Sequence, residues 1–368
     1  MTRCPSCQAT VGDSEEYCEA CGAQLSPTAP ATEPPMAAEA AKTTVALPAP
    51  DDLAGTATTC PSCGAEVSDD GYCGTCGTRA PKRRDHFVEQ PASWVAGVCD
   101  RGLRHTRNED AVALSADPEP GSRAVLVVCD GVSSSVDSDL ASLAAARAAR
   151  DVLASSRSRG MGEEISRVAA IAARLGAAAD AASDAVLDVT RNAKALAAEG
   201  GASAEVPPVT NPASCTFVAA VVEENLVVVG SVGDSRAYWL PDAGTAAALT
   251  LDDSYAQVLI AAGVPRLEAE SGPQSHAITR WLGPDAPDHK PATATLTVAE
   301  AGWLLICSDG LWNYCSAAED LATLVRQTSS GSPADAEPLA LAEALVSWAK
   351  AKGGQDNISA ALARLQPG

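Results

Sequence analysis

The amino-acid sequence predicts an α+β fold in which antiparallel sheets carry helices on their outer faces, preceded by small N-terminal modules. Two observations indicate the fold. Apolar runs of strand length occur in groups, and Ala-rich stretches with a helical pattern separate these groups without the regular alternation of a parallel α/β fold. A third observation indicates the modules: eight cysteines in Cys-x-x-Cys pairs fall within the first 80 residues.

The strands are predicted by short runs rich in Val, Leu and Ile, which favour extended backbone. These runs are Val95–Cys99, Ala124–Cys129, Thr216–Val222, Leu226–Val232, Ala237–Leu240, Trp303–Cys307 and Ile358–Ala363. The helices are predicted by stretches with few helix breakers. These stretches are Leu140–Ser155, Ile165–Leu196, Ala318–Thr328 and Pro338–Lys350.

Length and charge exclude several classes of protein. The chain has 368 residues, enough for one large domain and small modules, and its formal net charge is -21. This acidity disfavours nucleic acid and anionic membranes as partners, because binding to phosphate groups depends on Lys and Arg. No apolar run reaches about 18 residues, and the N-terminus lacks the apolar stretch of a secretory signal, so we expect a cytoplasmic protein.

The cysteine pairs predict two structural Zn²⁺ sites with four thiolates each. Both sets share CPSC, YC and CG sequences, which indicates an internal repeat that resembles bacterial zinc ribbons. The ligands are Cys4, Cys7, Cys18 and Cys21 in the first ribbon, and Cys60, Cys63, Cys73 and Cys76 in the second. Four thiolates complete a tetrahedral shell and leave no open catalytic position. A redox role is disfavoured because the pairs do not adjoin a βαβ pattern.

The composition divides the chain into two ribbons, two linkers and a large domain. We expect ribbons at residues 1–25 and 60–80, a flexible Ala/Pro/Thr linker at 26–59, a second linker at 81–93 and the large domain at 94–368. Lys82-Arg83-Arg84 is interpreted as a solvated charge run rather than a contact patch. Because a flexible stretch separates them from the large domain, the ribbons are expected to recruit a protein partner.

Acidic residues follow two of the predicted strands. Both apolar runs stop on the same dipeptide, Asp130-Gly131 and Asp309-Gly310. Two further acidic clusters, Asn108-Glu109-Asp110 and Asp356-Asn357, lie outside the runs. Convergent carboxylates repel one another unless cations lie between them, and hard oxygen ligands suit Mg²⁺ or Mn²⁺. The alternative for each Asp-Gly is an ordinary turn after a strand.

From about Trp94 to Leu365, ordered motifs resemble those of the metal-dependent serine/threonine protein phosphatases of type 2C, in particular the bacterial members. The motifs are DRG at Asp100–Gly102, RNED at Arg107–Asp110, CDG at Cys129–Gly131, SCTFVAAVV around Thr216, GSVGDSRAY at Gly230–Tyr238, LTLDDS at Leu249–Ser254, ITRWLG at Ile278–Gly283, CSDGLW at Cys307–Trp312 and GGQDNIS at Gly353–Ser359. The resemblance implies a four-layer α/β/β/α sandwich of two antiparallel sheets flanked by helices.

The resemblance also implies a site with two Mn²⁺ or Mg²⁺ ions and a third, weaker ion. The implied ligands are Asp130, Gly131, Asp309, Asp356, Glu109, Asp110 and Asp234, of which Asp110, Asp130, Asp309 and Asp356 form the catalytic set. Asp130 would bridge the two principal ions, and Asp309 and Asp356 would hold the second. Gly131 would offer its carbonyl oxygen to the first ion, where Glu109 and Asp110 would act through waters. Asp234 would support the third ion, with a local turn as the alternative.

The motifs leave three candidates for the phosphate-binding residue. At the place of a phosphate-binding arginine this chain has His105, with Arg104 before it and Arg107 after it. These three residues are the candidates, and solvated loop charge is the alternative for the two arginines. Val132 follows the first Asp-Gly dipeptide where relatives often have Gly or His. His105 or a bound water would then supply the proton to the leaving alcohol.

The sequence therefore favours a phosphatase that hydrolyses phosphoserine or phosphothreonine in proteins by attack of a water or hydroxide bridging two ions. Such an enzyme would oppose serine/threonine kinases. The alternative is a catalytically silent phosphoprotein-binding scaffold, a pseudophosphatase, because of the changes at His105 and Val132. A nucleic-acid-binding role for the ribbons is disfavoured by the acidic balance.

Overall fold

The computed structural model describes residues 2–3, 10–11, 55–155, 164–199, 211–272, 274–329 and 336–367. The chain divides into two compact units, residues 1–42 and 43–368. In the first unit, β1 (Thr2–Arg3) and β2 (Thr10–Val11) form an antiparallel pair. The predicted ligands of the first ribbon, Cys4, Cys7, Cys18 and Cys21, lie outside the described residues, as does the predicted linker up to residue 54.

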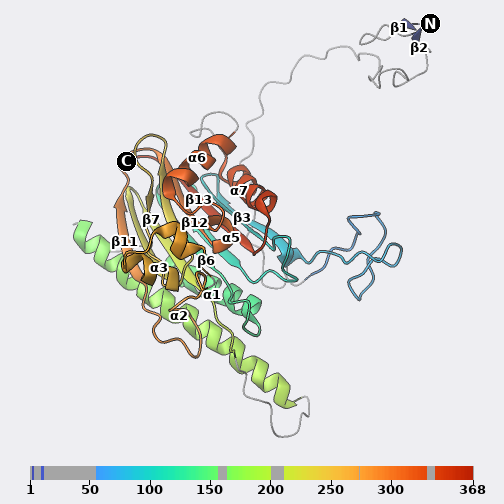
Figure 1. The fold of residues 1–368 in the computed structure, drawn as a ribbon, viewed down its shortest axis with the longest axis horizontal. Helices are drawn as coiled ribbons and strands as arrows, with labels where there is room; N and C mark the ends of the chain where they lie inside the picture. Colours follow the sequence, from blue (N-terminus) through green and yellow to red (C-terminus); the bar gives the residue numbers. More distant parts are fainter. Residues whose placement is uncertain are drawn as a thin grey trace. The chain divides into compact units, whose positions relative to one another are not determined.

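Two antiparallel sheets form the centre of the second unit (Figure 1). The six-stranded sheet has the order β10-β9-β12-β13-β4-β3. Its strands are β3 (His86–Ala92), β4 (Val95–Asp100), β9 (Arg236–Pro241), β10 (Ala247–Ala248), β12 (Gly302–Cys307) and β13 (Ile358–Leu365). The five-stranded sheet has the order β11-β8-β7-β6-β5. Its strands are β5 (Ala111–Ala116), β6 (Arg123–Cys129), β7 (Phe217–Glu223), β8 (Leu226–Val232) and β11 (Ala292–Thr297).

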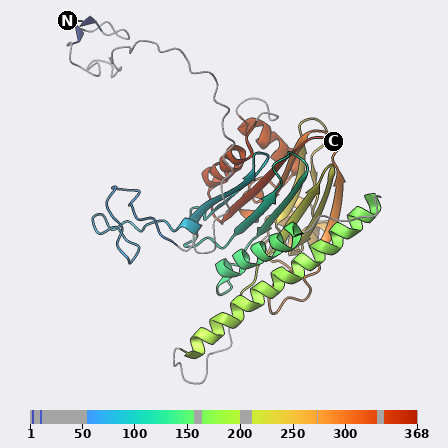
Figure 2. The same cartoon turned by 180° about the vertical axis from the view of Figure 1, so that it is seen from behind.

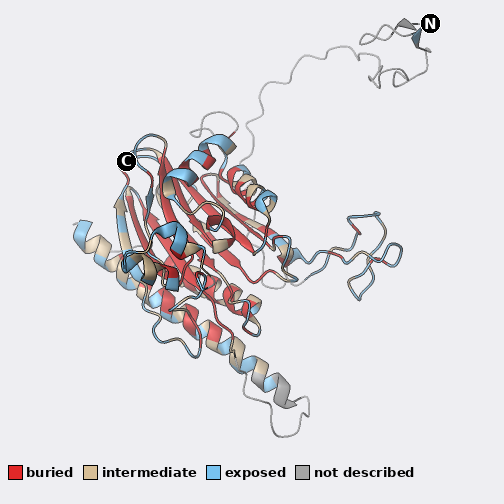
Figure 3. Ribbon diagram, viewed as in Figure 1, coloured by how far each residue is buried: buried red, intermediate tan, exposed pale blue. Residues whose placement is uncertain are grey.

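Successive side chains of the central strands point to opposite faces of their sheet. Each strand therefore contributes both to the core between the sheets and to the core under the helices. In β6, Leu126 and Val128 belong to the apolar core between the sheets, which also contains Leu304 and Ile306 of β12. Val127 points the other way, into the core under the helices of the five-stranded sheet. The central strands are therefore buried on both faces, as Figure 3 shows, and this explains their continuous apolar sequences.

Helices cover the outer face of each sheet (Figures 1 and 2). On the five-stranded sheet lie α1 (Ser138–Ala154) and α2 (Glu164–Glu199), and α1 packs through Ala141, Ala145 and Ala149, which share one helix face. On the six-stranded sheet lie α6 (Ala318–Thr328) and α7 (Pro338–Lys352). The predicted four-layer α/β/β/α sandwich is confirmed.

Short helices connect the strands around one end of the sheets. They are α3 (Tyr255–Ala261), α4 (Arg266–Glu270), α5 (Asp309–Trp312) and the 3-10 turn η2 (Arg83–Asp85). None of these was indicated by a long periodic pattern, because such short segments carry too few residues to show one. No helix among the described residues is both long and apolar enough to span a bilayer.

The predicted second linker, residues 81–93, is part of the folded domain. It contains η2 and β3, and β3 pairs with β4 from His86 opposite Asp100 to Ala92 opposite Val95. The strand was not predicted because Glu89, Gln90 and Pro91 interrupt its apolar pattern. Arg84 is buried, so the interpretation of this residue as a solvated charge is wrong.

Candidate functional site

Carboxylates from separate segments approach one another where strands of both sheets end. Asp130 follows β6, Asp309 begins α5 directly after β12, and Asp356 lies just before β13. Asp110 lies just before β5. Burial, and then the negative charges of Asp110, Asp309 and Asp356, raise the pKa of Asp130 well above its usual value. The fold therefore brings together the four carboxylates of the predicted catalytic set.

Asp110 and Asp309 each have a buried oxygen without a hydrogen-bond partner in the described part of the chain. Two hydroxyl groups, of Ser308 and Ser359, donate to Asp110 Oδ2 at 2.7 and 2.8 Å. Within the described residues, Asp110 Oδ1 and Asp309 Oδ1 have no hydrogen-bond partner. Burial raises the pKa of Asp110 to about 6, and burial with the charge of Asp356 raises that of Asp309 well above its usual value. Such oxygens are costly to bury alone, and their chemistry fits hard divalent cations.

Glu109 is kept ionised by its neighbours. Arg107 Nε and Nη2 donate to Glu109 Oε1 at 2.9 and 2.7 Å, and Ser138 Oγ donates to the same oxygen at 2.6 Å. Burial opposes ionisation of Glu109, but the hydrogen bonds from Ser138 and Arg107 outweigh it and lower the pKa. The Arg107 guanidinium is therefore engaged in orienting Glu109, and its contacts do not favour a phosphate-binding role.

Both Asp-Gly dipeptides are places of close backbone packing. A Cβ atom on Gly131 would lie 2.6 Å from the carbonyl oxygen of Glu109, and one on Gly310 would overlap the carbonyl oxygen of Asn357. Gly131 N also donates to the Glu109 carbonyl at 3.1 Å. Glycine at these positions lets the ends of β6 and β12 touch the other acidic segments, which an ordinary turn after a strand does not require.

Asp234 lies in a buried turn after β8. Burial and the charge of Asp252 raise the pKa of Asp234 to about 7. Its own charge in turn contributes to the raised pKa of Asp130 and Asp309. Trp312 Nε1 donates to the Asp234 carbonyl at 2.9 Å, which fixes this turn against α5. Asp234 therefore shares the electrostatic field of the cluster, and its support of a third ion stays a prediction.

His105 lies between two of the carboxylates. Its Nδ1 is 3.4 Å from Glu109 Oε2, and its Nε2 is 3.2 Å from Asp356 Oδ1. Arg104 is exposed and makes no side-chain hydrogen bond or ion pair within the described part of the chain. Of the three phosphate-binding candidates, His105 is thus the one that contacts carboxylates of two separate segments, Glu109 and Asp356.

A cavity of about 480 Å³ opens beside Asp309 and Asp356. Its lining includes His276, whose Nδ1 lies 3.9 Å from Asp309 Oδ2 and whose ring stacks on Trp312 with centroids 6.4 Å apart. Nothing in the sequence near His276 indicates this position, since no acidic cluster adjoins it. A pocket next to convergent carboxylates is where a substrate would enter.

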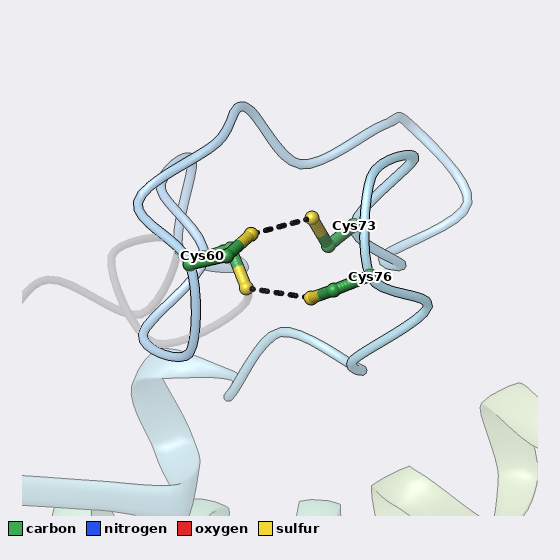
Figure 4. Close-up of side chains that lie close together, drawn as sticks. Cys60, Cys73 and Cys76 are labelled. Carbon is green, nitrogen blue, oxygen red and sulfur yellow. Dashed lines mark hydrogen bonds between the residues drawn. The ribbon is translucent and has the colours of Figure 1, made fainter.

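The second ribbon brings its four predicted ligands together. Cys60 Sγ lies 3.6 Å from Cys76 Sγ, and Cys63 Sγ lies 3.5 Å from Cys73 Sγ (Figure 4). Ligands about 2.3 Å from a tetrahedral Zn²⁺ are about 3.8 Å apart, so the sulfur positions fit this ion. Gly77, after the last cysteine, has a φ of 71°, which permits the turn.

The two candidate sites differ in how closely their ligand atoms gather. Among the described residues, the four cysteines of the second ribbon are the one group of three or more potential ligands whose atoms all lie within 4.8 Å of one another. The carboxylate oxygens are spread more widely over the strand ends. Waters would complete the coordination shell of a cation held by these carboxylates.

Convergent carboxylates at the strand ends of a two-sheet sandwich are typical of enzymes that use divalent cations. The family model of protein phosphatase 2C matches residues 103–348, and a double zinc ribbon model matches residues 4–83. The first match covers more than half of this chain, so the chain belongs to the protein phosphatase 2C family.

Known relatives agree with this assignment. The serine/threonine phosphatase stp of Listeria welshimeri is 31% identical over 153 residues, which cover 41% of this chain and 57% of that protein. The chain thus spans little more than half the length of this relative. The structure of the serine/threonine phosphatase PstP/Ppp of Mycobacterium tuberculosis is similar at 26% identity and a TM-score of 0.53, covering 74% of this chain and 98% of the other. The catalytic domain of PstP in complex with two manganese ions is similar at 24% identity and a TM-score of 0.50, covering 73% and 96%.

Proposed function

We propose that the protein is a metal-dependent phosphatase that hydrolyses phosphoserine and phosphothreonine in proteins. The observation that carries this proposal is the convergence of Asp110, Asp130, Asp309 and Asp356 from four segments, with buried carboxylate oxygens that have no protein partner among the described residues. Family membership and the phosphatase relatives support the same activity.

The acidic cluster would hold two Mn²⁺ or Mg²⁺ ions. Glu109, Asp110 and the Gly131 carbonyl would hold one ion, Asp309 and Asp356 would hold the other, and Asp130 would serve both. The manganese ions in the related PstP catalytic domain support this choice of metal. When bound, such a pair of ions lowers the pKa of a water and neutralises the charge of a phosphoryl group during in-line attack.

The chain's own residues prepare the site for substrate. Arg107 and Ser138 fix the carboxylate of Glu109, and the hydroxyls of Ser308 and Ser359 fix that of Asp110. His105 is placed to contact the phosphate or to give a proton to the departing serine or threonine oxygen. The cavity beside Asp309 would admit the phosphorylated segment.

We further propose that the ribbons bind Zn²⁺ and recruit protein partners. The sulfur geometry of Cys60, Cys63, Cys73 and Cys76 supports zinc in the second ribbon. The double ribbon match supports a second such module. Substrates would be phosphoproteins made by serine/threonine kinases, and the setting would be the cytoplasm.

Asp309 provides the sharpest test of this function. The purified chain should hydrolyse a phosphothreonine peptide with Mn²⁺ and lose this activity in EDTA. Asp309→Asn should lower kcat by at least about 100-fold, because a neutral amide holds a divalent cation poorly and the loss removes charge stabilisation in the transition state. The matched control is Asp184→Asn, at an exposed site on α2, which should turn over normally. Normal turnover by Asp309→Asn would contradict the assigned role.

The same experiment distinguishes the phosphatase from the alternative, a catalytically silent pseudophosphatase. The presence of His105 and Val132, where the motifs of the family often have other residues, favours this alternative. If the chain binds Mn²⁺ and phosphopeptide but releases no phosphate, the scaffold role holds and the phosphatase role fails.

A further inference from the structure

The turn that joins the second ribbon to β3 places an arginine inside the molecule. Arg84, in η2, is only 8% exposed. Burial lowers the pKa of its guanidinium, and no ion pair compensates the charge among the described residues. Burial of a cation costs free energy unless hydrogen bonds within the protein replace its lost hydration.

The hydrogen bonds of Arg84 end on the loop that carries Glu109 and Asp110. Arg84 Nε donates to the carbonyl oxygen of Asn108 at 3.1 Å, and Nη2 donates to that of Asp110 at 3.0 Å. In return, Asn108 Nδ2 donates to the carbonyl oxygen of Arg84 at 2.9 Å. Arg84 therefore holds this loop through its backbone carbonyl groups and not through the carboxylates of Glu109 and Asp110.

The same guanidinium reaches the first turn of α1 and completes the clamp. Nη2 donates to the carbonyl oxygen of Asp139 at 2.5 Å and to Ser142 Oγ at 3.2 Å. Ser142 Oγ donates in turn to the carbonyl oxygen of Glu109. Three successive carbonyl groups, at positions 108, 109 and 110, are thus held directly by Arg84 or through Ser142.

The chain on either side of the second ribbon is joined immediately before Arg84. Arg83 N donates to the carbonyl oxygen of Gly55 at 2.8 Å, and Ala57 N donates to that of Pro81 at 3.0 Å. Arg83 itself is exposed. Arg84 is therefore the residue through which the base of the ribbon contacts the loop of Glu109 and Asp110.

We propose that Arg84 is a positioning residue for the first divalent ion, acting through the backbone of residues 108–110. This inference rests on the proposed metal site, and it goes beyond it because none of the phosphatase-like motifs includes Arg84. The hydrogen bonds of the guanidinium end on backbone carbonyl groups and on Ser142. They fix the backbone from which Glu109 and Asp110 project, so that the two carboxylates meet an ion without first having to be ordered.

The test compares Mn²⁺ binding by four forms of the full chain loaded with zinc: wild type, Arg84→Ala, Arg84→Lys and Arg83→Ala. Free Mn²⁺ is measured by its electron paramagnetic resonance signal during titration. We expect Arg84→Ala to weaken Mn²⁺ binding by about 10- to 100-fold, as loss of a supporting contact around a metal typically does. Arg84→Lys keeps the charge but offers fewer aligned donors, so its effect should be smaller. Arg83→Ala, which removes the neighbouring exposed arginine, should bind like wild type.

The outcomes separate this inference from the proposed function. If wild type binds no Mn²⁺, the metal site and the inference both fail. If wild type binds Mn²⁺ and a folded Arg84→Ala binds it equally well, only the inference fails. If Arg84→Ala does not fold, as judged by circular dichroism, Arg84→Lys decides: a folded Arg84→Lys with wild-type affinity overturns the inference. Recovery of peptide turnover by Arg84→Ala at high Mn²⁺ would support it, since a positioning role affects ion binding before it affects chemistry.

Discussion

His105 shows how a single residue can connect two parts of the acidic cluster. Its two ring nitrogens face Glu109 and Asp356, so a protonated ring would be attracted to both sides of the acidic cluster. A phosphate bound at the same place would compete with these carboxylates for the ring. With divalent ions bound, the charge of the carboxylates would be neutralised, and His105 would be available to the substrate phosphate.

Substitution of His105 tests this role. We expect His105→Gln to raise KM for a phosphothreonine peptide by about 10-fold, the effect of losing one hydrogen bond between charged groups. His105→Arg should restore a low KM, because its planar guanidinium can bind phosphate through two donors. The control is His289→Gln, a partly exposed histidine paired with Asp180. Steady-state kinetics at saturating Mn²⁺ provide the measurement. An unchanged KM for His105→Gln would contradict a role in phosphate binding, and an unchanged kcat would contradict a role in proton transfer.

The sequence indicates those site residues that belong to short sequence motifs. Asp130 and Asp309 are each followed by a glycine, which the close packing of the backbone requires. The Asp-Gly dipeptide is therefore visible in the sequence as a sign of this packing. His276 and Arg84 carry no such signal. They reach the site through tertiary contacts with α5 and with the loop before β5, and one sequence does not reveal which distant segments will meet.

At the scale of secondary-structure elements, burial decides which strands can be predicted. β6 and β12 are buried on both faces, and their continuous apolar runs were predicted almost to the residue. β11 is an edge strand with the sequence ATATLT and is exposed along much of its length, so it has no apolar run. β3 is also an edge strand, and its pattern is broken by a buried glutamate.

That glutamate, Glu89, makes the stability of the domain depend on pH. It is 2% exposed and accepts a hydrogen bond from Leu114 N at 2.6 Å. Burial raises its pKa to about 7, so the folded state holds a proton that the unfolded state has released above about pH 4.5. This contribution to the free energy of unfolding is complete at low pH and is lost as the pH rises through 7.

Glu89→Gln should therefore flatten the pH dependence of stability. Between pH 5 and 8 we expect the wild type to lose about 2 kcal/mol more than the variant. Urea unfolding followed by tryptophan fluorescence is a suitable measurement, because all six tryptophans lie at or after Trp94 and report on the large domain alone. Glu119→Gln, at an exposed turn, is the control. Parallel pH profiles for wild type and Glu89→Gln would show that Glu89 is ionised in the folded state.

At the scale of the whole molecule, the second ribbon and the sandwich are joined by a short, well-bonded segment rather than a free linker. The ribbon contributes no side chain to the acidic cluster among the described residues. Among the described residues, backbone hydrogen bonds join the base of the ribbon directly before Arg84, which in turn contacts the loop of Asp110. If the proposed functions hold, recruitment by the ribbons and chemistry at the acidic cluster should be separable, provided that Arg84 is kept.

Deleting Met1–Ala80 tests this separation, because the cut removes both ribbons and leaves Arg84 with its contacts to the loop. At saturating Mn²⁺, turnover of a small aryl phosphate should be nearly unchanged, since such a substrate needs only the cavity and the acidic cluster. Removal of phosphate from protein substrates in a cell extract should slow, because partner recruitment is lost. A full-length Cys63→Ser/Cys76→Ser variant, which breaks the second thiolate shell without shortening the chain, should behave the same way toward the aryl phosphate. A large loss of aryl phosphate turnover in the deletion variant would mean that the ribbons take part in building the active site, and the recruitment proposal would have to be abandoned.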